Sequence, residues 1–384
     1  MDLPARGNKQ RTRRDSSYAT LRYSRAAIDK AGKSLALLTS SEEEVSRALD
    51  VLANWRSSHA FPLNSMTMDL KQKVKRVNPQ GLVAQRLKRA KSIVGKLLFK
   101  PSMRLTQMQD IGGCRAIVGS LEDVYKLKEL YLQSRSLHEI ISQDDYIAHP
   151  KTSGYRGLHL VFRFKSRSHP EYDRLLFEVQ LRTFTQHAWA TAVETVGAII
   201  GQALKSSEGQ AEWLEYFKYA ALALEFSEPA PFASIPPFSK GDVARSLASL
   251  DESLQVHAKL TAYGEALRAT ERVNLRDTGY FLLVLTPGDP GRYQPELKIF
   301  SYSKRNADLA YKEYERYERL LPLYPPDGQL SLFPDFANAS GAQAVLVGAE
   351  SFKTIRDSFP NYYLDTRSFL TKIDAFVKEN KRRR

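Results

Sequence analysis

The spacing of apolar and polar residues divides the first two thirds of the chain into helices and strands. Apolar residues recur at helical intervals through residues 17–57, where Ser40 or Ser41 can cap a helix whose first turn carries three glutamates. The same reasoning predicts further helices over residues 79–100, 121–134, 184–201 and 242–270. Short apolar or alternating runs predict strands at residues 115–118, 145–147, 158–164 and 175–181. The last two can pair as a hairpin.

A cluster of prolines at positions 229, 231, 236 and 237 interrupts this pattern and predicts an inter-domain linker. After it, strands are expected at residues 280–285, 297–302, 344–347 and 362–364, and helices at 307–320, 351–358 and 367–378. We therefore expect an α+β fold with four parts. These are a basic flexible N-terminus (1–16), a first domain (17–227), a linker with a connecting helix (228–274) and a C-terminal domain (275–384).

Composition narrows the class of protein. The chain has 384 residues, of which 42% are hydrophobic and 26% charged, as expected for a soluble globular protein. No apolar stretch approaches the roughly 20 residues that span a bilayer, and the polar, basic start predicts no secretory signal. The single cysteine, Cys114, cannot form an internal disulfide. These features agree with a cytoplasmic protein without a membrane partner.

The formal net charge of +14 favours polyanionic partners such as nucleic acid or nucleotides, although the chain can also be merely basic and soluble. The positive charges are clustered at both ends of the chain and in two internal groups, at residues 71–76 and 86–91. The terminal groups are expected to be flexible. The internal groups lie within ordered patterns and are therefore more informative.

Three segments carry candidate chemistry, and the first is basic. In residues 84–96, Arg86, Lys88 and Lys96 recur at spacings that gather cations on one surface of the expected helix. Binding a triphosphate requires several Arg and Lys donors. A basic helix face is nevertheless more often only solvated.

The second segment, residues 109–115, places Asp110 beside Gly112 and Gly113 at the entrance of a strand. A carboxylate held there is well placed to bind Mg²⁺, and Arg115 can meet a phosphate. The alternative is a loop carboxylate paired with a neighbouring arginine.

The third segment combines residues 151–159 with residues 177–183. Glycines flank Tyr155, so a loop can present its ring to a base. Glu178, Gln180 and Arg182 alternate by two and share one face of a strand, whereas the intervening residues are apolar. One face of this strand is therefore packed. The other carries out chemistry or is simply solvated.

In this order, the three segments resemble the synthetase domain of the RelA/SpoT homologue family. Residues 110–115 are similar to its Asp-x-x-x-x-Arg element, residues 154–159 (GYRGLH) to its Gly-Tyr-Arg-Ser-Leu-His loop, and residues 178–183 (EVQLRT) to its Glu-Val-Gln-Ile-Arg-Thr strand. The resemblance covers about residues 80–200. Gly157 stands where many members have serine, which loosens the assignment of the acceptor. The implied fold is nucleotidyltransferase-like, a mixed sheet with flanking helices.

The resemblance implies a pyrophosphokinase and a role for each matching residue. Asp110 and Glu178 would hold Mg²⁺, with Glu178 also acting as general base on a 3′-hydroxyl. ATP, the diphosphate donor, would be held by Arg86, Lys88, Lys96 and Arg115. Tyr155 would stack on the acceptor base, and the acceptor or transferred phosphates would be contacted by Arg156, His159, Gln180 and Arg182. None of the seven histidines precedes an aspartate, so the family's hydrolase activity is not expected.

The C-terminal domain resembles the regulatory part of the CapRel type of fused toxin–antitoxin, which is zinc-finger-like without metal ligands. No Cys or His follows His257, so no zinc is expected there. The family's Tyr-x-x-Tyr motif, which covers the ATP site, matches either Tyr311 with Tyr314 or Tyr314 with Tyr317. On spacing alone, a partly buried aromatic stripe explains these tyrosines equally well.

The resemblance implies a self-inhibited toxin acting in anti-phage defence. Its acceptor would be the 3′-terminal adenosine of the tRNA CCA end, so that translation stops. The basic groups would meet the acceptor-stem phosphates, and a phage protein, expected to be a capsid protein, would release the C-terminal domain. The alternatives are a small alarmone synthetase that uses GDP or GTP, and an inactive RNA-binding module. The last has no need of acids facing phosphates.

Overall fold

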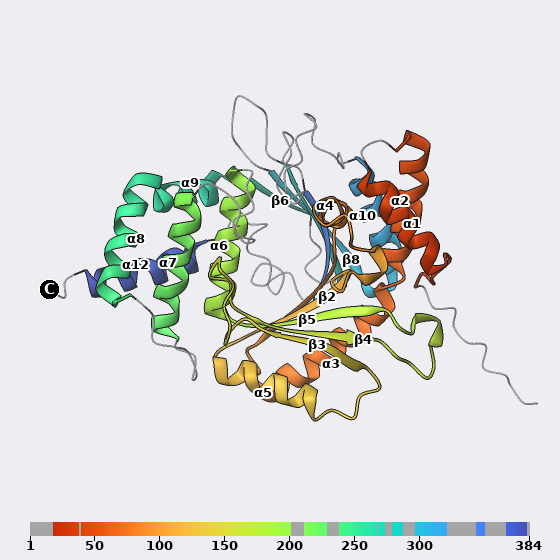
Figure 1. Cartoon of the computed structure of the whole chain (residues 1–384), viewed down its shortest axis with the longest axis horizontal. Coiled ribbons are helices and arrows are strands. Elements are labelled where there is room, and N and C mark those ends of the chain that lie inside the picture. The colour runs from red at the N-terminus through yellow and green to blue at the C-terminus, as the bar shows by residue number, and fades with distance from the viewer. Residues whose placement is uncertain are drawn as a thin grey trace, which may run out of the picture.

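A computed structural model gives the structure of the protein. It describes residues 18–37, 40–200, 211–228, 238–266, 268–272, 279–286, 296–320, 343–349 and 366–381. These residues form a mixed sheet with helices on its faces and a helical bundle beside it (Figure 1). No helix in these ranges combines the length and the apolar character that crossing a membrane requires.

Three helices open the described chain, namely α1 (Arg25–Ala36), α2 (Glu42–Ser57) and α3 (Ala60–Val77). The predicted cap of α2 is confirmed and is Ser41. Its hydroxyl accepts the Glu44 N–H at 3.3 Å, and the Glu44 carboxylate accepts the Ser41 N–H at 3.1 Å. The sequence prediction missed α3, which is buried along one side by residues such as Leu63, Met66 and Leu70.

Nine strands form one sheet in the order β3-β4-β5-β2-β1-β9-β7-β8-β6. The pairs β2/β5 and β6/β8 are parallel and the remaining pairs antiparallel, so the predicted mixed sheet is confirmed. The predicted hairpin is confirmed as β4 with β5. The bounds are β1 (Leu82–Leu87), β2 (Gly112–Val118), β3 (Glu139–Asp145), β4 (Leu158–Arg163), β5 (Leu176–Thr183), β6 (Arg268–Arg272), β7 (Gly279–Thr286), β8 (Glu296–Ser303) and β9 (Gln343–Ala349).

The prediction of a single helix over residues 79–100 is wrong. The segment forms strand β1, a short turn, and then helix α4 (Ala90–Phe99). Arg86 therefore lies on a strand and Lys88 at its end, while only Lys96 is helical. The physical reason is tertiary, because β1 lies between two neighbouring strands, β2 and β9, whose ladders satisfy its backbone.

The two faces of the sheet are covered differently. Helices α3 and α5 (Leu121–Leu132) lie beneath strands β1 to β5 in Figure 1. Apolar side chains of β5, including Phe177, Val179 and Leu181, join those helices in one core. The opposite face of the same strands is bordered by α4 on one side and α6 (Phe184–Ile200) on the other. The polar side chains of β5 point to this second face.

A helical bundle follows, formed by α6, α7 (Ala211–Ser227), α8 (Lys240–Leu254), α9 (Val256–Ala266) and α12 (Arg367–Asn380). The predicted helices at 121–134 and 184–201 are confirmed as α5 and α6. The single helix expected over 242–270 is wrong. Gln255 adopts a left-handed conformation (φ 54°) that ends α8 before α9 begins, and residues 268–272 form β6.

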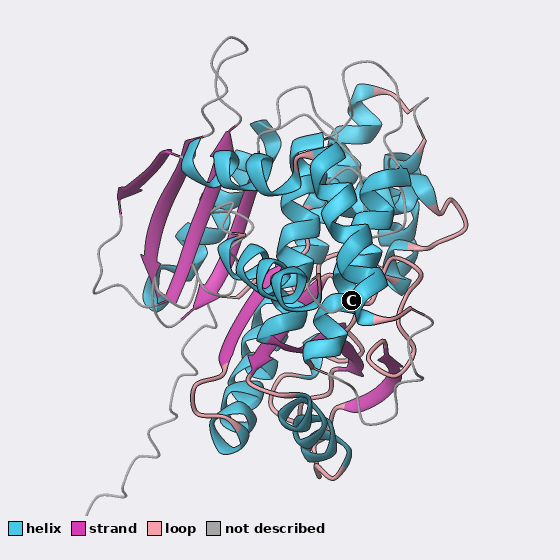
Figure 2. Ribbon diagram, turned by 90° about the vertical axis from the view of Figure 1, so that its left-hand side faces the viewer, coloured by secondary structure: helices cyan, strands magenta, loops and turns pink. Residues whose placement is uncertain are grey.

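The C-terminal part contributes the remaining strands and α10 (Ala307–Leu320), which lies on strands β7, β8 and β9. Figure 2 shows strands of the sheet side by side with helices packed next to them. The predicted strands at 280–285, 297–302 and 344–347 and the helix at 307–320 are confirmed. The helix expected at 351–358 and the strand at 362–364 lie outside the described residues. Two features cross the predicted boundary at residue 275: β9 pairs with β1, and α12 packs against α6, α7 and α8.

Candidate active site

The site is built on rows of residues that run across β1, β2 and β5. Arg86, Gly113 and Glu178 occupy one row and Ala84, Arg115 and Gln180 the next. Residues paired across neighbouring strands point to the same face, here the face away from α3. Gly113 has no side chain, so the space between Arg86 and Glu178 stays open. The cavity there is lined by Ala84, Gln85, Arg86, Lys88, Asp110, Gly113, Cys114, Arg115, Glu178 and Gln180.

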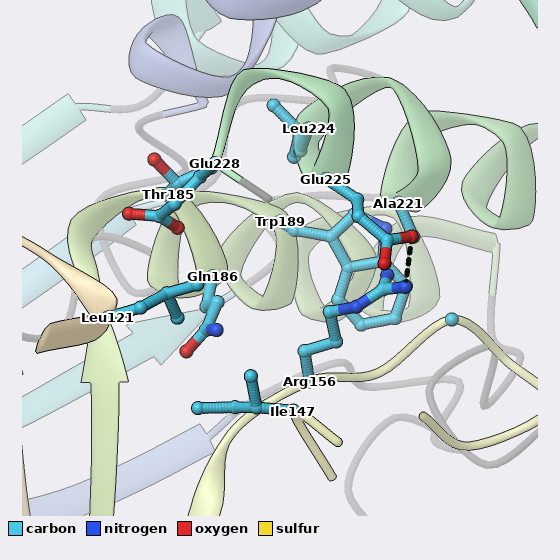
Figure 3. A pocket seen from close by; sticks show the side chains of 11 residues that line it. Leu121, Ile147, Arg156, Thr185, Gln186, Trp189, Ala221, Leu224, Glu225 and Glu228 are labelled. Carbon is cyan, nitrogen blue, oxygen red and sulfur yellow. Dashed lines mark hydrogen bonds and ion pairs between the residues drawn. The ribbon is translucent and has the colours of Figure 1, made fainter. Parts of the chain in front are cut away.

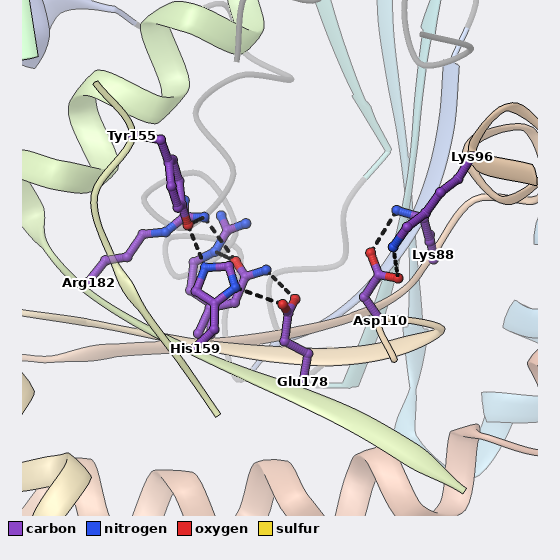
Figure 4. Close-up of polar contacts among 9 residues, drawn as sticks. Lys88, Lys96, Asp110, Tyr155, His159, Glu178 and Arg182 are labelled. Carbon is purple, nitrogen blue, oxygen red and sulfur yellow. Dashed lines mark hydrogen bonds and ion pairs between the residues drawn. The ribbon is translucent and has the colours of Figure 1, made fainter. Parts of the chain in front are cut away.

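Asp110 lies in the turn before β2 and is held by two lysines. Lys88 Nζ donates to Oδ2 at 2.9 Å and Lys96 Nζ to Oδ1 at 3.1 Å (Figure 4). Burial alone would raise the pKa of Asp110, but the two ammonium groups outweigh it and hold this pKa well below its usual range. Lys88, directly after β1, and Lys96, in the last turn of α4, therefore meet at one carboxylate. Their contacts with ATP phosphates stay predictions.

Glu178 is held by two donors from its own face of the sheet. His159 Nδ1 contacts Oε1 at 2.7 Å, and Gln180 Nε2 donates to Oε2 at 2.6 Å. Burial would raise the pKa of Glu178. The contact with His159 and the hydrogen bond from Gln180 outweigh burial and lower the pKa to about 2. The side chain is therefore a fixed carboxylate at neutral pH.

His159 continues this hydrogen-bonded chain. Tyr155 Oη lies 2.6 Å from His159 Nε2 and accepts a hydrogen bond of 2.6 Å from Arg182 Nη2. Burial lowers the pKa of His159, so its imidazole is neutral at neutral pH. We assign its proton to Nδ1, because Nε2 then accepts from the tyrosine while Nδ1–H donates to the carboxylate. Each group in this series then donates a hydrogen bond to the next: Arg182 to Tyr155, Tyr155 to His159, and His159 to Glu178.

Two arginines, Arg115 of β2 and Arg182 of β5, make this part of the site strongly cationic. Arg182 is 1% exposed, and its Nε and Nη1 have no hydrogen-bond partner among the described residues. Burial, together with the charge of Arg182, lowers the pKa of Arg115 to about 9. Buried guanidinium donors that are not fully paired favour an anion in the same space.

The two carboxylates fit Mg²⁺ in part. Each oxygen of Asp110 and Glu178 accepts a hydrogen bond, and a carboxylate oxygen can accept two. No group of three or more His, Cys, Asp or Glu side chains among the described residues forms a metal cage. Mg²⁺ characteristically takes one or two carboxylates and completes its shell with water and substrate phosphates. This pair suits an ion that arrives with a nucleotide.

Two predicted acceptor residues lie differently from expectation. Tyr155 is 2% exposed, because its ring packs against Trp189 of α6 instead of being presented by the loop. Arg156 points away from Glu178 into a second pocket between the 151–157 loop, α6 and α7, where it pairs with Glu225 (Figure 3). Their proposed contacts with an acceptor stay predictions.

The three predicted regulatory tyrosines have different surroundings. Tyr314 is 1% exposed and accepts a hydrogen bond of 2.8 Å from Arg56 Nη2 of α2. The ring of Tyr311 packs on Tyr280 and reaches the core of the first domain. The ring of Tyr317 packs on Phe300 within the C-terminal part. Tyr311 and Tyr314 are therefore the pair that faces the first domain.

Sequence reasoning missed several residues beside the site. Arg56 lies on α2 outside every motif, yet its Nε donates to the Lys88 carbonyl at 2.9 Å. Lys151 Nζ lies 4.2 Å from the ring centre of Tyr146, which also contacts His159 edge-on. Tyr146 could have been found by extending the 151–159 segment towards the N-terminus, whereas Lys151 lies inside that segment but was given no role. Arg56 offered no such signal.

The two internal basic groups lie on different faces of the sheet. Residues 71–76 belong to α3, which covers the lower face of the sheet in Figure 1. Glu178 points to the opposite face. Lys73 is paired within α3 with Asp69 at 2.5 Å. Only the group at 86–91, at the end of β1 and the start of α4, borders the cavity.

Comparison with known proteins places a family region over this site. Residues 85–196 match the model described as a region found in RelA / SpoT proteins. The chain is 35% identical over 116 residues to GTP pyrophosphokinase YjbM of Bacillus subtilis (strain 168), covering 30% of this chain and 54% of that protein. It is 32% identical over 119 residues to GTP pyrophosphokinase YwaC of the same organism, covering 30% and 56%. The chain thus spans about half the length of these relatives.

Solved structures overlap with the same part of the chain. Small alarmone synthetase 1 from Bacillus subtilis, bound to its product pppGpp, gives a TM-score of 0.38 at 26% identity and covers 45% of this chain and 92% of that one. A GTP pyrophosphokinase family protein from Streptococcus pneumoniae gives 0.39 at 23% identity, covering 44% and 85%. Asp110, Glu178 and their contacts within the sheet all lie inside the matched family region. Arg56 and α10 lie outside it.

Proposed function

We propose that the chain is a pyrophosphokinase of the RelA/SpoT type that transfers diphosphate from ATP to the 3′-hydroxyl of the adenosine at the tRNA CCA end. One observation carries the proposal. Asp110 and Glu178, embedded in a matched RelA/SpoT region, line the same cavity as Arg86, Lys88 and Arg115. Two carboxylates and several cations around one space suit the transfer of a phosphoryl group with its metal.

The donor side lies at the end of β1. Lys88 and Lys96 each donate to one oxygen of Asp110, and Arg86 stands in the same row as Glu178. These cations would hold the ATP phosphates, and Asp110 and Glu178 would hold Mg²⁺. The ion would supply neutralisation of charge on the phosphates during transfer.

The acceptor side lies towards β4 and α6. Arg182 has buried donors that meet no partner within the described ranges, and Gln180 lies between it and Glu178. These side chains would position the ribose and its phosphate. The 3′-oxygen would attack the β-phosphorus of ATP, the bond from that phosphorus to the oxygen bridging the α-phosphate would break, and AMP would leave.

The proton of the 3′-hydroxyl needs an acceptor, and Glu178 is the nearest candidate by its place in the sheet. A carboxylate of pKa about 2 is a weak base at neutral pH. The negative charge of a bound triphosphate would raise that pKa. His159 and Gln180 would hold the carboxylate in position while it accepts the proton.

The C-terminal part would inhibit the site in cis. Tyr314 contacts Arg56, which in turn bonds to the main chain of Lys88. Helix α10 thus reaches the border of the proposed ATP site, where Tyr314 contacts Arg56 and Glu318 contacts the main chain of Ala90. A phage protein, expected to be a capsid protein, would activate the enzyme by withdrawing α10.

The choice of tRNA over GDP or GTP rests on charge. The net charge of +14 and the cations at 86–91, at the rim of the site, favour a long polyanion. The relatives named GTP pyrophosphokinases favour the alternative, a small alarmone synthetase that makes guanosine tetra- or pentaphosphate.

A transfer assay tests the proposal. The full chain and its Tyr314→Ala variant are incubated with Mg²⁺ and ATP labelled at the γ-phosphate, together with either bulk tRNA or GDP and GTP. We expect label on tRNA, lost when the CCA end is trimmed, and more of it with the variant. Label on GDP or GTP would establish the alarmone alternative, and label on neither acceptor would refute the pyrophosphokinase.

A further inference from the structure

The end of α10 places a carboxylate on the first residue of α4. Glu318 Oε1 accepts the Ala90 N–H at 3.0 Å and the Tyr314 hydroxyl at 2.8 Å, and Oε2 is paired with Arg56 Nη1. The guanidinium of Arg56 also lies over the Tyr314 ring, 5.1 Å from its centre. One anionic group from the C-terminal part thus receives a main-chain N–H, a guanidinium and a phenol.

This set of donors is suited to a phosphate group. Main-chain N–H groups at a helix N-terminus attract anions, and an arginine fork matches phosphate as well as carboxylate. Both partners are buried, because Arg56 is 4% exposed and the Glu318 side chain 9%. A buried arginine of this kind requires an anion beside it, whichever molecule supplies that anion.

The position of these donors connects them to the proposed ATP site. Arg56 Nε donates to the Lys88 carbonyl, and Ala90 follows Lys88 by two residues. Lys88 Nζ in turn reaches Asp110. The donors of Arg56 and Ala90 therefore lie beside the cations at the end of β1. Together they provide a place for one further anionic group.

We propose that Arg56 and the N-terminus of α4 form a phosphate subsite, and that Glu318 occupies it in place of a phosphate group of the substrate. The ligand class is the polyphosphate chain of a nucleoside triphosphate. This inference rests on the proposed function and deepens it, because it names the group by which α10 excludes the donor. Two anions cannot share these donors, so phosphate binding and docking of Glu318 exclude each other.

A neighbouring cavity of about 480 Å³ provides room for such an exchange. Its walls come from the α2 side chains Val45, Leu49 and Leu52, together with Arg56, Ala90, Glu315 and Glu318. The end of α10 borders this space, so Glu318 can leave Arg56 without displacing the core of the first domain. Release of α10 then needs no change at Asp110 or Glu178.

Binding of polyphosphate, measured by titration calorimetry on the full chain, tests the subsite. The probes are α,β-methylene-ATP with Mg²⁺, which is not turned over, and sodium tripolyphosphate, which lacks the nucleoside. Glu318→Gln removes the competing charge and is expected to tighten binding of both probes by about tenfold. Glu313→Gln is the matched control, because Glu313 lies on the same helix and pairs with Arg316 of α10. Its affinity should stay within about twofold of the wild type.

A second variant separates the subsite from simple opening of α10. Combining Glu318→Gln with Arg56→Lys keeps a cation but removes the fork, so most of the gain should be lost. Equal affinities of the Glu318 and Glu313 variants would overturn the proposal, as would a gain that survives Arg56→Lys or is confined to the nucleotide. Because no turnover is involved, failure of the transfer assay leaves this result standing. A transfer-active chain whose Glu318 variant binds no tighter refutes only this inference.

Discussion

At the scale of single residues, the site is defined by how its two carboxylates are held. Asp110 is paired with two lysines, whereas Glu178 receives hydrogen bonds from a neutral imidazole and an amide. Both carboxylates are ionised at neutral pH. Of the groups that hold them, only the two lysines beside Asp110 are positively charged and can also bind a triphosphate. In the proposed reaction, Asp110 would therefore belong to the donor side and Glu178 to the place where donor and acceptor meet.

Glu178→Gln is expected to lower transfer by at least about a hundredfold, because an amide can neither accept the proton nor neutralise the metal. The amide has nearly the same shape, so the fold should persist and the melting temperature should change little. The γ-label transfer assay and circular dichroism measure the two quantities. Glu139→Gln, at the exposed end of β3, is the matched control. Wild-type turnover in the Glu178 variant would remove this residue from the site.

His159→Phe keeps a ring but removes the donor to Glu178. The pKa of Glu178 should then rise from about 2 towards the ordinary glutamate value of 4.5. A carboxylate with a depressed pKa stabilises the fold above its unfolded pKa and loses that contribution as pH falls through the folded value. The stability lost between pH 4.5 and pH 2 should therefore be smaller in the variant. Titration of ¹³C-labelled glutamate by NMR checks this, and an unchanged Glu178 pKa would contradict it.

At the scale of elements, the two halves of the sheet meet at the short pairing of β1 with β9. Only Gln85 with Gly348 and Arg86 with Val347 are in register there. A Cβ at Gly348 would lie 2.5 Å from Gln85 Nε2 and 2.9 Å from its Cγ. The absence of a side chain at Gly348 thus permits the close approach that places the C-terminal strands beside the site.

Gly348→Ala is expected to destabilise this junction by about 1–3 kcal/mol through overpacking against Gln85. The expected sign is faster amide exchange in β9 with little change in β4 and β5, measured by hydrogen–deuterium exchange. Adding Gln85→Ala clears the contact and should restore much of the protection. If amide exchange in β9 is as fast in the double variant as in the single one, the contact with Gln85 is not the cause.

At the scale of the whole molecule, strand β9 and helices α10 and α12 join the C-terminal part to the first domain. Strand β9 pairs with β1, α10 contacts Arg56 and α4, and α12 packs in the bundle with α6, α7 and α8. Phe369 and Phe376 of α12 are buried against Phe217 and Phe226. Removing everything after residue 270 would therefore take α12 out of the bundle as well as release α10.

Deleting residues 367–384 isolates the contribution of α12. Burial of a large aromatic is worth about 3–5 kcal/mol, so loss of Phe369 and Phe376 should lower the melting temperature by several degrees or more. Circular dichroism melts measure the change, and deletion of residues 382–384 alone is the control. A melting temperature equal to that of the full chain would show that α12 is dispensable for the bundle.

The sequence alone determined the local elements and the identity of the chemical groups. The cap at Ser41, the hairpin of β4 with β5, and helix α10 follow from nearest neighbours and periodicity. The alternation of Glu178, Gln180 and Arg182 was sufficient to place them on one face. Such features depend on residues a few positions apart, so pattern reasoning finds them.

Only the tertiary structure decided how distant segments meet. Residues 82–87 form a strand because β2 and β9 pair with them, although their spacing suggested a helix. Tyr155 is buried because α6 packs over it, and Arg56 meets Glu318 across 262 positions of the chain. Strand pairing, burial and buried ion pairs depend on packing between segments that are far apart in the sequence. A local pattern contains no information about that packing.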